Sequence, residues 1–305
     1  MGPEASDTSS NATLAANLRE LASLLEQQNA DGFRVSAYRN AADTVDGLDR
    51  PVRDILAAGG SEALVALPNI GRGIASALSE IVTTGRWSQL DRLRGSSEPE
   101  QLFRTIPGIG AELAQKISDD LHVETLEALE VAAHDGRLER VAGFGPRRVK
   151  MIRTALAERL GRPRLRRIRQ AVYERPPVSV LLDVDREYRK KAAVDQLRRI
   201  APKRFNPGGD AWLPIMHTRR GQWDFTVLFS NTRLAHELGR IKDWVVIYYH
   251  TDALPEGQCT VVTERRGKLA GRRVVRGREE EALAARELST RYLTHVKGRV
   301  ASRSA

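Results

Sequence analysis

The chain has 305 residues, more than most single domains contain, so we expect two domains that each bury a core. Apolar residues make up 41% of the chain, which excludes a largely disordered protein. The formal net charge of +10 favours a polyanionic partner. The single cysteine, Cys259, excludes an internal disulfide and a cysteine-based zinc site, and it fits a reducing compartment such as the cytoplasm.

Residues 1–12 are acidic and polar, and we expect them to form a disordered tail. No apolar stretch follows them, so the sequence predicts neither a signal peptide nor a membrane anchor. The distribution of charge matters more than its sum, because residues 1–160 carry a net charge of −5 and residues 161–305 a net charge of +15.

Residues 13–160 have helical patterns and no alternating strand pattern. Leucines at 14, 18, 21 and 25 share one face of a first helix, for which Asn11 is the expected cap. A second helix is expected over residues 33–45. A third should begin at Pro51 and end at the pair Gly59-Gly60.

A repeated motif follows in this helical half. The segments LPNIGRGIASALSEI (67–81), IPGIGAELAQKI (106–117) and VAGFGPRRVKMI (141–152) align without gaps. Their central glycines are Gly71, Gly110 and Gly145. Each copy predicts a helix, a tight glycine-containing turn and a second helix, which is a helix-hairpin-helix motif.

This motif has a physical route to phosphate binding. Glycine accepts the dihedral angles of a tight turn and lets another backbone approach closely. The first amides of the second helix have no partner within the helix and lie at its positive end, so they can bind an anion. One such turn could simply connect two helices, but three in register favour DNA binding without base readout. The expected DNA-contacting residues of the hairpins are Asn69, Gly71, Arg72, Gly73, Gly108, Gly110, Lys116, Gly143, Gly145, Arg147, Arg148 and Lys150.

The composition changes after residue 160. Residues 161–175 are arginine-rich and are predicted to be a basic linker. Beyond them, apolar runs at 212–218, 222–229, 243–249, 258–264 and 272–277 predict strands, and residues near 281–297 predict a helix. The expected fold class is therefore α+β: an all-helical half followed by a smaller mixed domain. The predicted boundaries are 13–95 for the first helical domain, 96–160 for the second and third hairpins, and 176–305 for the α+β domain.

The order and spacing of the helical motifs in residues 13–160 resemble the amino-terminal region of family X DNA polymerases. Residues 33–45 with 67–87 are similar to the 8-kDa domain of that family, and 106–117 with 141–152 to its second helix-hairpin-helix region. The resemblance implies a 5′-phosphate pocket in the first domain, of which Arg34, Tyr38 and Arg39 remain.

The resemblance also implies functions that this chain has partly lost. Ala77 occupies the position of the family's Schiff-base lysine, so deoxyribose-phosphate lyase activity is not expected. Lysines of the phosphate pocket are replaced by Val65 and Gly73, and Asn69 replaces the first glycine of the turn. The family holds a monovalent cation, Na⁺ or K⁺, through hairpin carbonyls. The matching positions are Val65, Leu67, Ile70, Arg104, Ile106 and Ile109.

A polymerase palm requires aspartates that share metal ions. Asp183 and Asp185 are the candidate pair, but their surroundings predict a helix, on which residues two apart point in different directions. His236-Glu237 lacks the second histidine of a zinc-protease helix, and His217, His250 and Cys259 lie on separate expected strands. We therefore expect no catalytic residues of the polymerase kind.

Basic residues of the second half alternate with Trp212, Trp223 and Trp244. They predict either a surface for single-stranded DNA or a solvated basic surface over buried tryptophans. The whole sequence predicts a structure-selective, sequence-independent DNA-binding protein of DNA repair, with gapped, nicked or single-strand-containing DNA as its partner. The alternatives are a diverged polymerase-like or nuclease-like enzyme with its site in residues 170–305, and a protein-interaction scaffold.

Overall fold

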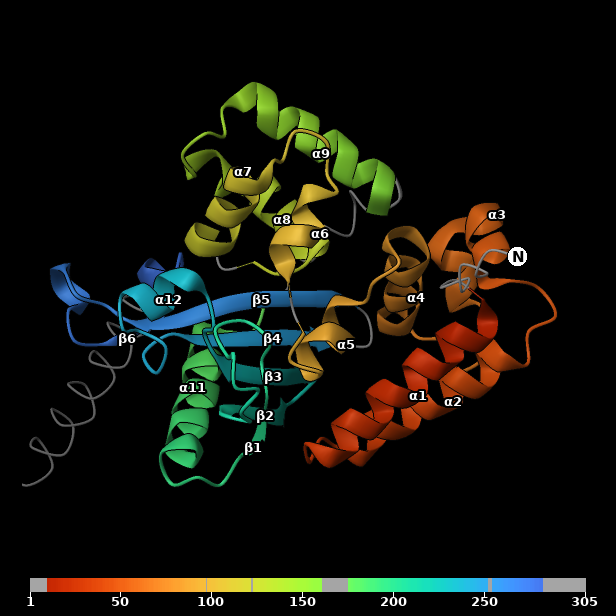
Figure 1. The fold of residues 1–305 in the computed structure, drawn as a ribbon, viewed down its shortest axis with the longest axis horizontal. Helices are drawn as coiled ribbons and strands as arrows, with labels where there is room; N and C mark the ends of the chain where they lie inside the picture. The colour runs from red at the N-terminus through yellow and green to blue at the C-terminus, as the bar shows by residue number, and fades with distance from the viewer. Residues whose placement is uncertain (1–9, 97, 122, 161–174, 252–253, 282–305) are drawn as a thin grey trace, which may run out of the picture.

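The computed structural model describes residues 10–96, 98–121, 123–160, 175–251 and 254–281 (Figure 1). The tail up to residue 9, the linker up to residue 174 and nearly all of the helix expected near 281–297 lie outside these ranges. The helices of the amino-terminal half are α1 (Asn11–Gln27), α2 (Gly32–Asp46), α3 (Val52–Val65), α4 (Arg72–Thr84), α5 (Ser88–Leu93), α6 (Pro99–Arg104), α7 (Ala111–Lys116), the π-helix η1 (Ile117–Leu121), α8 (Leu126–His134), the 3-10 helix η2 (Leu138–Arg140) and α9 (Pro146–Leu160).

The first three helices differ from the sequence prediction at their ends. Ser10, and not Asn11, caps α1 by accepting a hydrogen bond from the Thr13 amide. Helix α1 therefore includes residues 11 and 12 of the expected tail. The Asn11 side chain instead binds the carbonyls of Leu48 and Arg50, at 3.2 and 3.0 Å, and so ties α1 to the link between α2 and α3. Helix α3 does not end at the glycine pair but bends at Gly60, where φ is +64°.

The second half contains one antiparallel sheet in which each strand pairs with its sequence neighbours. The short edge strand β1, with two arginines among its three residues, was not predicted; the other five strands match the predicted runs, so the α+β fold class is confirmed. Two helices accompany the sheet, α11 before it and α12 between β3 and β4. The bounds are α11 (Val178–Ala193), β1 (Arg198–Ile200), β2 (Leu213–Arg220), β3 (Trp223–Phe229), α12 (Arg233–Glu237), β4 (Val245–Thr251), β5 (Leu254–Thr263), the 3-10 helix η4 (Gly267–Leu269) and β6 (Arg273–Val275).

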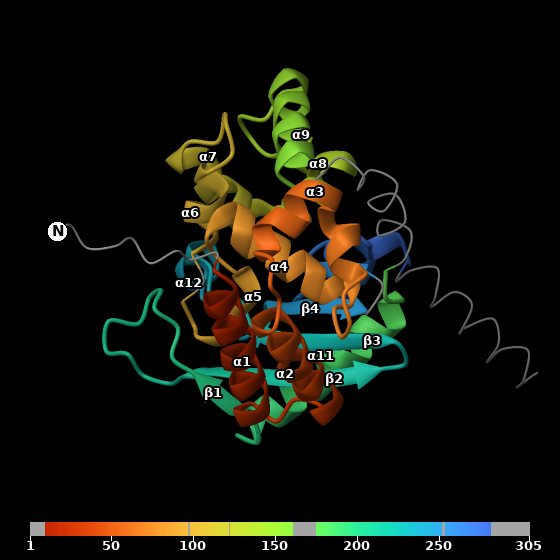
Figure 2. The same ribbon diagram turned by 90° about the vertical axis from the view of Figure 1, so that its right-hand side faces the viewer.

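Both faces of the sheet are covered (Figure 2). On β4, Val245 and Ile247 pack with α11, whereas Val246 and Tyr248 pack with the first helical region. This alternation follows from the period of two in a strand, since successive side chains point to opposite faces. The first helical region and the sheet thus share one hydrophobic core, although they are far apart in the sequence.

Helices α6 to α9 form a separate layer beside strand β5 (Figure 1). Their core draws only on residues between Leu102 and Leu160, with no side chain from the sheet. We call residues 99–160 the tandem, because they hold the second and third hairpins.

Candidate nucleic-acid interface

The first hairpin turn joins α3 to α4 through residues 67–71. Asn69 has the left-handed φ of +60° that its position requires. The Ile70 amide donates to the Leu67 carbonyl at 3.4 Å, and the Ile70 side chain is buried between the two helices. Gly71 is extended, with φ of −72° and ψ of 171°, and α4 begins directly after it.

The other two turns repeat this geometry. Gly108 and Gly143 take the left-handed position with φ of +86° and +99°. The amides of Ile109 and Phe144 donate to the carbonyls three residues earlier, at 3.1 Å in each case. Both of these apolar side chains are buried. The structure therefore shows a threefold repeat of one turn, as the sequence predicted.

Each turn leaves the start of its second helix open. The residues that precede α4, α7 and α9 are glycines, which have no side chain to cap the first amides of the helix. Gly71, Gly110 and Gly145 are exposed, and a Cβ built on any of them would have no neighbour within 4 Å. An anion can therefore closely approach the free amides at the start of all three helices, which in α9 begin at Arg147 because Pro146 has no N–H.

The second and third hairpins pack against each other through their left-handed glycines. A Cβ on Gly143 would lie 2.9 Å from a methyl group of Leu113 on α7. A Cβ on Gly108 would collide with the end of Met151 on α9. Since each hairpin turn rests on the second helix of the other hairpin, the tandem presents its two turns as one unit.

The charge around the three turns differs. Arg147, Arg148 and Lys150 are exposed in the first turn of α9, and Arg148 donates to the Gly143 carbonyl. In the second hairpin, Lys116 pairs with Glu112 at 2.6 Å. The first hairpin contributes the exposed Arg72. The third hairpin thus has the most cationic surroundings.

The structure separates the three residues of the expected 5′-phosphate pocket. Arg34 and Tyr38 are only 9% and 6% exposed, because α2 packs on the sheet. One guanidinium nitrogen of Arg34 donates to Thr226 of β3 at 3.4 Å, and Tyr38 donates to Gln89. Arg39 is half exposed and pairs with Glu26. No pattern near Arg34 predicts this burial, because Thr226 of the covering strand lies 192 residues away in the sequence.

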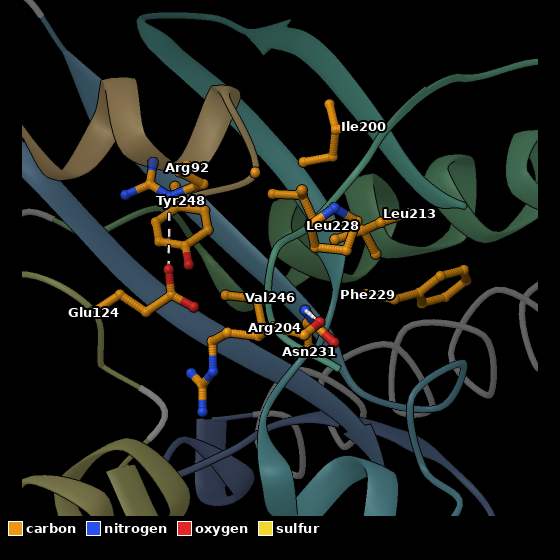
Figure 3. A pocket seen from close by; sticks show the side chains of 12 residues that line it. Arg92, Glu124, Ile200, Arg204, Leu213, Leu228, Phe229, Asn231, Val246 and Tyr248 are labelled. Atoms are coloured by element: carbon orange, nitrogen blue, oxygen red, sulfur yellow. Dashed lines mark hydrogen bonds and ion pairs between the residues drawn. The ribbon is translucent and has the colours of Figure 1, made fainter. Parts of the chain in front are cut away.

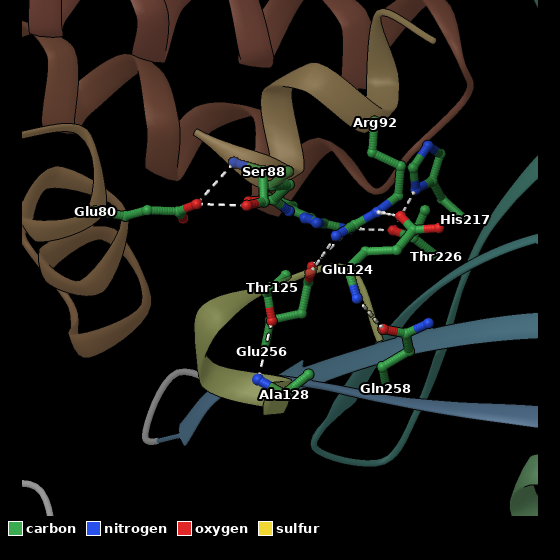
Figure 4. A network of polar contacts seen from close by, with 12 residues as sticks. Glu80, Ser88, Arg92, Glu124, Thr125, Ala128, His217, Thr226, Glu256 and Gln258 are labelled. Atoms are coloured by element: carbon green, nitrogen blue, oxygen red, sulfur yellow. Dashed lines mark hydrogen bonds and ion pairs between the residues drawn. The ribbon is translucent and has the colours of Figure 1, made fainter. Parts of the chain in front are cut away.

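A buried network holds the helical regions on the sheet (Figure 4). Arg92 of α5 is 4% exposed and forms a two-pronged ion pair with Glu256 of β5, at 2.7 and 3.1 Å. Its guanidinium carbon also lies 3.4 Å from the centre of the Tyr248 ring. Burial lowers the pKa of Arg92, but the interactions with Glu256, Tyr248 and Glu124 together outweigh burial and raise the pKa. Glu124, just before α8, lies 3.9 Å from Arg92, so one arginine joins α5, the tandem and the sheet.

A pocket lies beside this network (Figure 3). It encloses about 490 Å³ of empty space, including space open to solvent. Its walls include the apolar side chains of Ile200, Leu213 and Leu228. Its two arginines, Arg92 and Arg204, pair with Glu256 and Glu100, which leaves little positive charge for a phosphate.

The residues expected to lack catalytic function occupy structural positions. Ala77 is buried in α4, so no amine stands at the position of the family's lyase lysine. Asp183 and Asp185 lie on α11, as predicted, and bind different arginines. Asp183 pairs with Arg220 at 3.1 Å, and the buried Asp185 pairs with Arg273 at 2.7 Å.

His217, His250 and Cys259 of the sheet domain are possible metal ligands, and its tryptophans are possible stacking platforms for bases. Within the ranges that the structure describes, no three His, Cys, Asp or Glu side chains are placed to hold a metal ion. Trp223 and Trp244 are buried in the sheet domain, which removes two of the three rings that might have stacked on bases. Burial raises the pKa of the Cys259 thiol to about 12.

The carbonyls proposed to hold a cation lie in the first two hairpins. Those of Leu67 and Ile106 each accept one amide hydrogen bond, which leaves each oxygen a second lone pair. Neutral carbonyl oxygens fit a monovalent ion. The remaining positions, Val65, Ile70, Arg104 and Ile109, stay predictions of the resemblance.

Two protein-family models match the amino-terminal half of the chain. Residues 9–87 match a family model described as a helix-hairpin-helix domain, and residues 85–158 match one described as a SAM-like helix-hairpin-helix tandem. These ranges contain the three turns and stop before the sheet domain. Among the described residues, no helix has the length and apolar character to cross a membrane.

A curated protein is similar to about half of the chain. It is the DNA polymerase/3'-5' exonuclease PolX of Bacillus subtilis (strain 168), with 28% identity over 172 residues. The match covers 56% of this chain and 27% of that protein, so the chain spans about a quarter of the relative's length. The amino-terminal half is thus a polymerase X-like helix-hairpin-helix region.

Proposed function

We propose that this protein binds DNA through backbone phosphates, without reading base sequence, and that the tandem provides its main grip. The observation that carries this proposal is the threefold repeat of a turn whose glycine exposes the first amides of a helix. The amides of α9 lie beside Arg147, Arg148 and Lys150, so the third hairpin should bind phosphate most strongly.

The similarity to a DNA polymerase suggests a role in DNA repair, with preference for gapped, nicked or single-strand-containing DNA. We propose a binding role in place of the relative's catalysis, since Asp183 and Asp185 are tied to arginines on a helix. The single cysteine agrees with a cytoplasmic setting. A monovalent ion on the hairpin carbonyls would neutralise part of the phosphate charge.

The test is DNA binding by fluorescence anisotropy at several salt concentrations, with duplex, nicked, gapped and single-stranded oligonucleotides. The double variant Gly145→Leu/Arg147→Glu keeps the fold, because Gly145 has open space around it, but it blocks the amides and reverses a charge. We expect it to bind about tenfold more weakly or worse. Equal affinity for all four oligonucleotides would remove the structure preference, and no binding to any of them would overturn the proposal.

A matched control makes the same kinds of change, a new leucine and a reversed arginine charge, away from the hairpins. The variant Ala193→Leu/Arg199→Glu adds a leucine at the exposed end of α11 and reverses an arginine that pairs with Asp195. We expect this variant to bind DNA like the unmodified protein. Single variants Gly71→Leu and Gly110→Leu then measure the shares of the other hairpins, and Gly110→Leu should have a smaller effect than Gly145→Leu.

A further inference from the structure

The turn between β5 and β6 is a compact loop that carries four exposed cations. The Gly271 amide donates to the Glu264 carbonyl at 2.7 Å, and the Glu264 amide donates to the Arg272 carbonyl at 2.8 Å. These bonds close a loop of residues 264–272. We call Arg265, Arg266, Lys268 and Arg272 the basic turn; all four side chains are exposed.

A buried side chain anchors the loop to the sheet domain. Leu269 is 7% exposed and packs with Val262 of β5 and with Trp244, which directly precedes β4. Gly267 and Gly271 have φ of +71° and +78°, which gives the loop its tight shape. The basic turn is therefore preformed, so its cations lose little backbone freedom when they bind a partner.

The acid within this loop does not pair with its cations. One carboxylate oxygen of Glu264 accepts the backbone amides of Arg265 and Arg266, at 2.7 and 3.0 Å. Across the ranges that the structure describes, no carboxylate lies within ion-pair distance of the basic turn. Its four cationic groups are thus available to an external anion.

Five other arginines of the sheet domain already contact a carboxylate or an aromatic ring. Arg204, Arg220 and Arg273 form ion pairs with carboxylates at 3.1 Å or less. Arg278 pairs with Glu281, and Arg276 lies over the Trp244 ring. Single residues such as Lys190, Lys203 and Lys242 are also exposed without an ion pair among the described residues, but the basic turn gathers four such cations within eight consecutive residues.

The basic turn lies at the end of the sheet domain beside α12, and α12 in turn contacts the tandem. Ala235 of α12 packs in the same cluster as Leu269. Two residues earlier on α12, Arg233 reaches Asp119 of η1, which continues directly from α7, at 3.9 Å. Helix α12 therefore connects the loop to the second hairpin (Figure 1).

We propose that the basic turn is a second contact for DNA, which binds backbone phosphates beyond those held by the hairpins. This inference rests on the proposed function. Arginine matches phosphate with two parallel hydrogen bonds, and lysine adds a point charge. The loop carries no aromatic side chain, so it contacts the backbone and not the bases. It explains how an acidic hairpin half attracts DNA: the sheet domain supplies the charge.

The experiment compares the full-length protein with the variant Arg265→Gln/Arg266→Gln/Lys268→Gln/Arg272→Gln. Binding to a fluorescent 30-base-pair duplex is measured over a series of KCl concentrations. The slope of log K against log salt is negative, and each lost phosphate contact makes it shallower by about 0.9. We therefore expect the four substitutions together to reduce its magnitude by about 3 to 4. The pair Arg265→Gln/Arg266→Gln alone should lower it by about 2.

The matched control is Arg19→Gln/Arg199→Gln, which removes two charges from arginines that already pair with aspartates. Its slope should equal that of the unmodified protein. A similar fall in this control and in Arg265→Gln/Arg266→Gln would show that net charge alone matters, and it would overturn the basic turn as a site. Thermal unfolding of each variant shows whether it is folded.

Two further outcomes separate this inference from the proposed function. If the Gly145→Leu/Arg147→Glu variant weakens binding while the basic-turn variant keeps its slope, the hairpins bind DNA and the basic turn does not. If the unmodified protein binds no DNA but its basic turn is needed for binding to vesicles of anionic lipid, both proposals are wrong. A shallower slope in the basic-turn variant, together with residual DNA binding, supports both proposals.

Discussion

The first hairpin region and the tandem bury their cores in different ways. Helices α1 to α5 share their core with one face of the sheet, and this contact covers Arg34 and Tyr38. The tandem fills its core with its own side chains and touches the sheet through polar contacts such as that between the Glu124 amide and Gln258, at 3.1 Å. The same motif is thus used once as part of a larger core and twice as a self-supporting unit.

This difference shows that a hairpin turn can keep its geometry while the packing around it changes which neighbouring side chains can bind phosphate. All three turns have the same dihedral pattern, yet the first region loses predicted phosphate ligands to the interior, whereas Arg147, Arg148 and Lys150 of the tandem stay at the surface. Packing the first region on the sheet removes two expected phosphate ligands from solvent. DNA binding should therefore depend on the tandem more than on the first domain.

The variant with the largest expected effect tests the Arg92 network, which holds the first helical region on the sheet. Arg92→Ala removes the buried half of this ion pair and leaves the partly buried carboxylate of Glu256 without its partner, so we expect a loss of about 3–5 kcal/mol in the free energy of unfolding. Urea denaturation measures it. Hydrogen exchange should show loss of protection first in α2 and β3, while α8 and α9 stay protected.

The control for this variant is Arg94→Ala, because Arg94 pairs with Glu20 at the surface. We expect it to cost no more than about 1 kcal/mol. Equal losses in the two variants would show that the buried network does not hold the region on the sheet.

A second change tests the tandem by itself. Gly143→Val forces a branched side chain into φ of +99° and against Leu113, so we expect a loss of about 2–4 kcal/mol. In Gly145→Val the new side chain meets open space, and the expected loss is about 1 kcal/mol or less. Protection of the sheet amides should survive both changes; its collapse in Gly143→Val would mean that the tandem and the sheet unfold together.

A third prediction concerns pH at the buried face of the sheet. Burial, and then the charges of Arg34 and Arg92, hold the pKa of His217 and of His250 well below the usual value; His217 and Arg219 add to this at His250. Below about pH 6.5 the unfolded histidines bind protons that the folded ones do not. Stability is therefore unaffected by them above about pH 6.5 and falls as the pH decreases, by up to about 1.4 kcal/mol per pH unit for each histidine.

Unfolding of the His217→Gln variant between pH 5 and pH 8 isolates one of these groups. Glutamine can still bond with Thr226 and Gln28, which the imidazole contacts at 3.1 and 3.0 Å. Its stability should fall less steeply in acid than that of the unmodified protein. Parallel curves would mean that His217 is protonated in the folded state.

The smallest effect is expected at the turn of the first hairpin. Asn69→Ala places an ordinary residue at φ of +60° and removes the bond to Thr44, so we expect a loss of about 1 kcal/mol. Asn69→Gly should be close to neutral, because glycine adopts this conformation freely. If the two variants unfold at the same denaturant concentration, the left-handed geometry is not what asparagine contributes there.

Several features could be predicted from particular residues. The three turns followed from their glycines, and the position of Asp183 and Asp185 on a helix followed from the spacing of Leu181, Val184 and Tyr188, all of which are buried. Strand β1 was missed because its two arginines carry no apolar pattern, as befits an edge strand. The Arg92 network was missed because its acids lie at positions 124 and 256, and nothing near them in the sequence signals the contact.

The sequence by itself determined the hairpin turns, because their geometry depends on which residues tolerate left-handed dihedrals and close backbone approach. Only the tertiary structure decided which cations remain available to phosphate. Arg34 is buried because α2 packs on β3, while Arg265 and Arg266 have no ion-pair partner among the described residues because Glu264 accepts main-chain amides. Burial and pairing depend on contacts between distant segments, and those contacts form only when the sheet and the helices share a core.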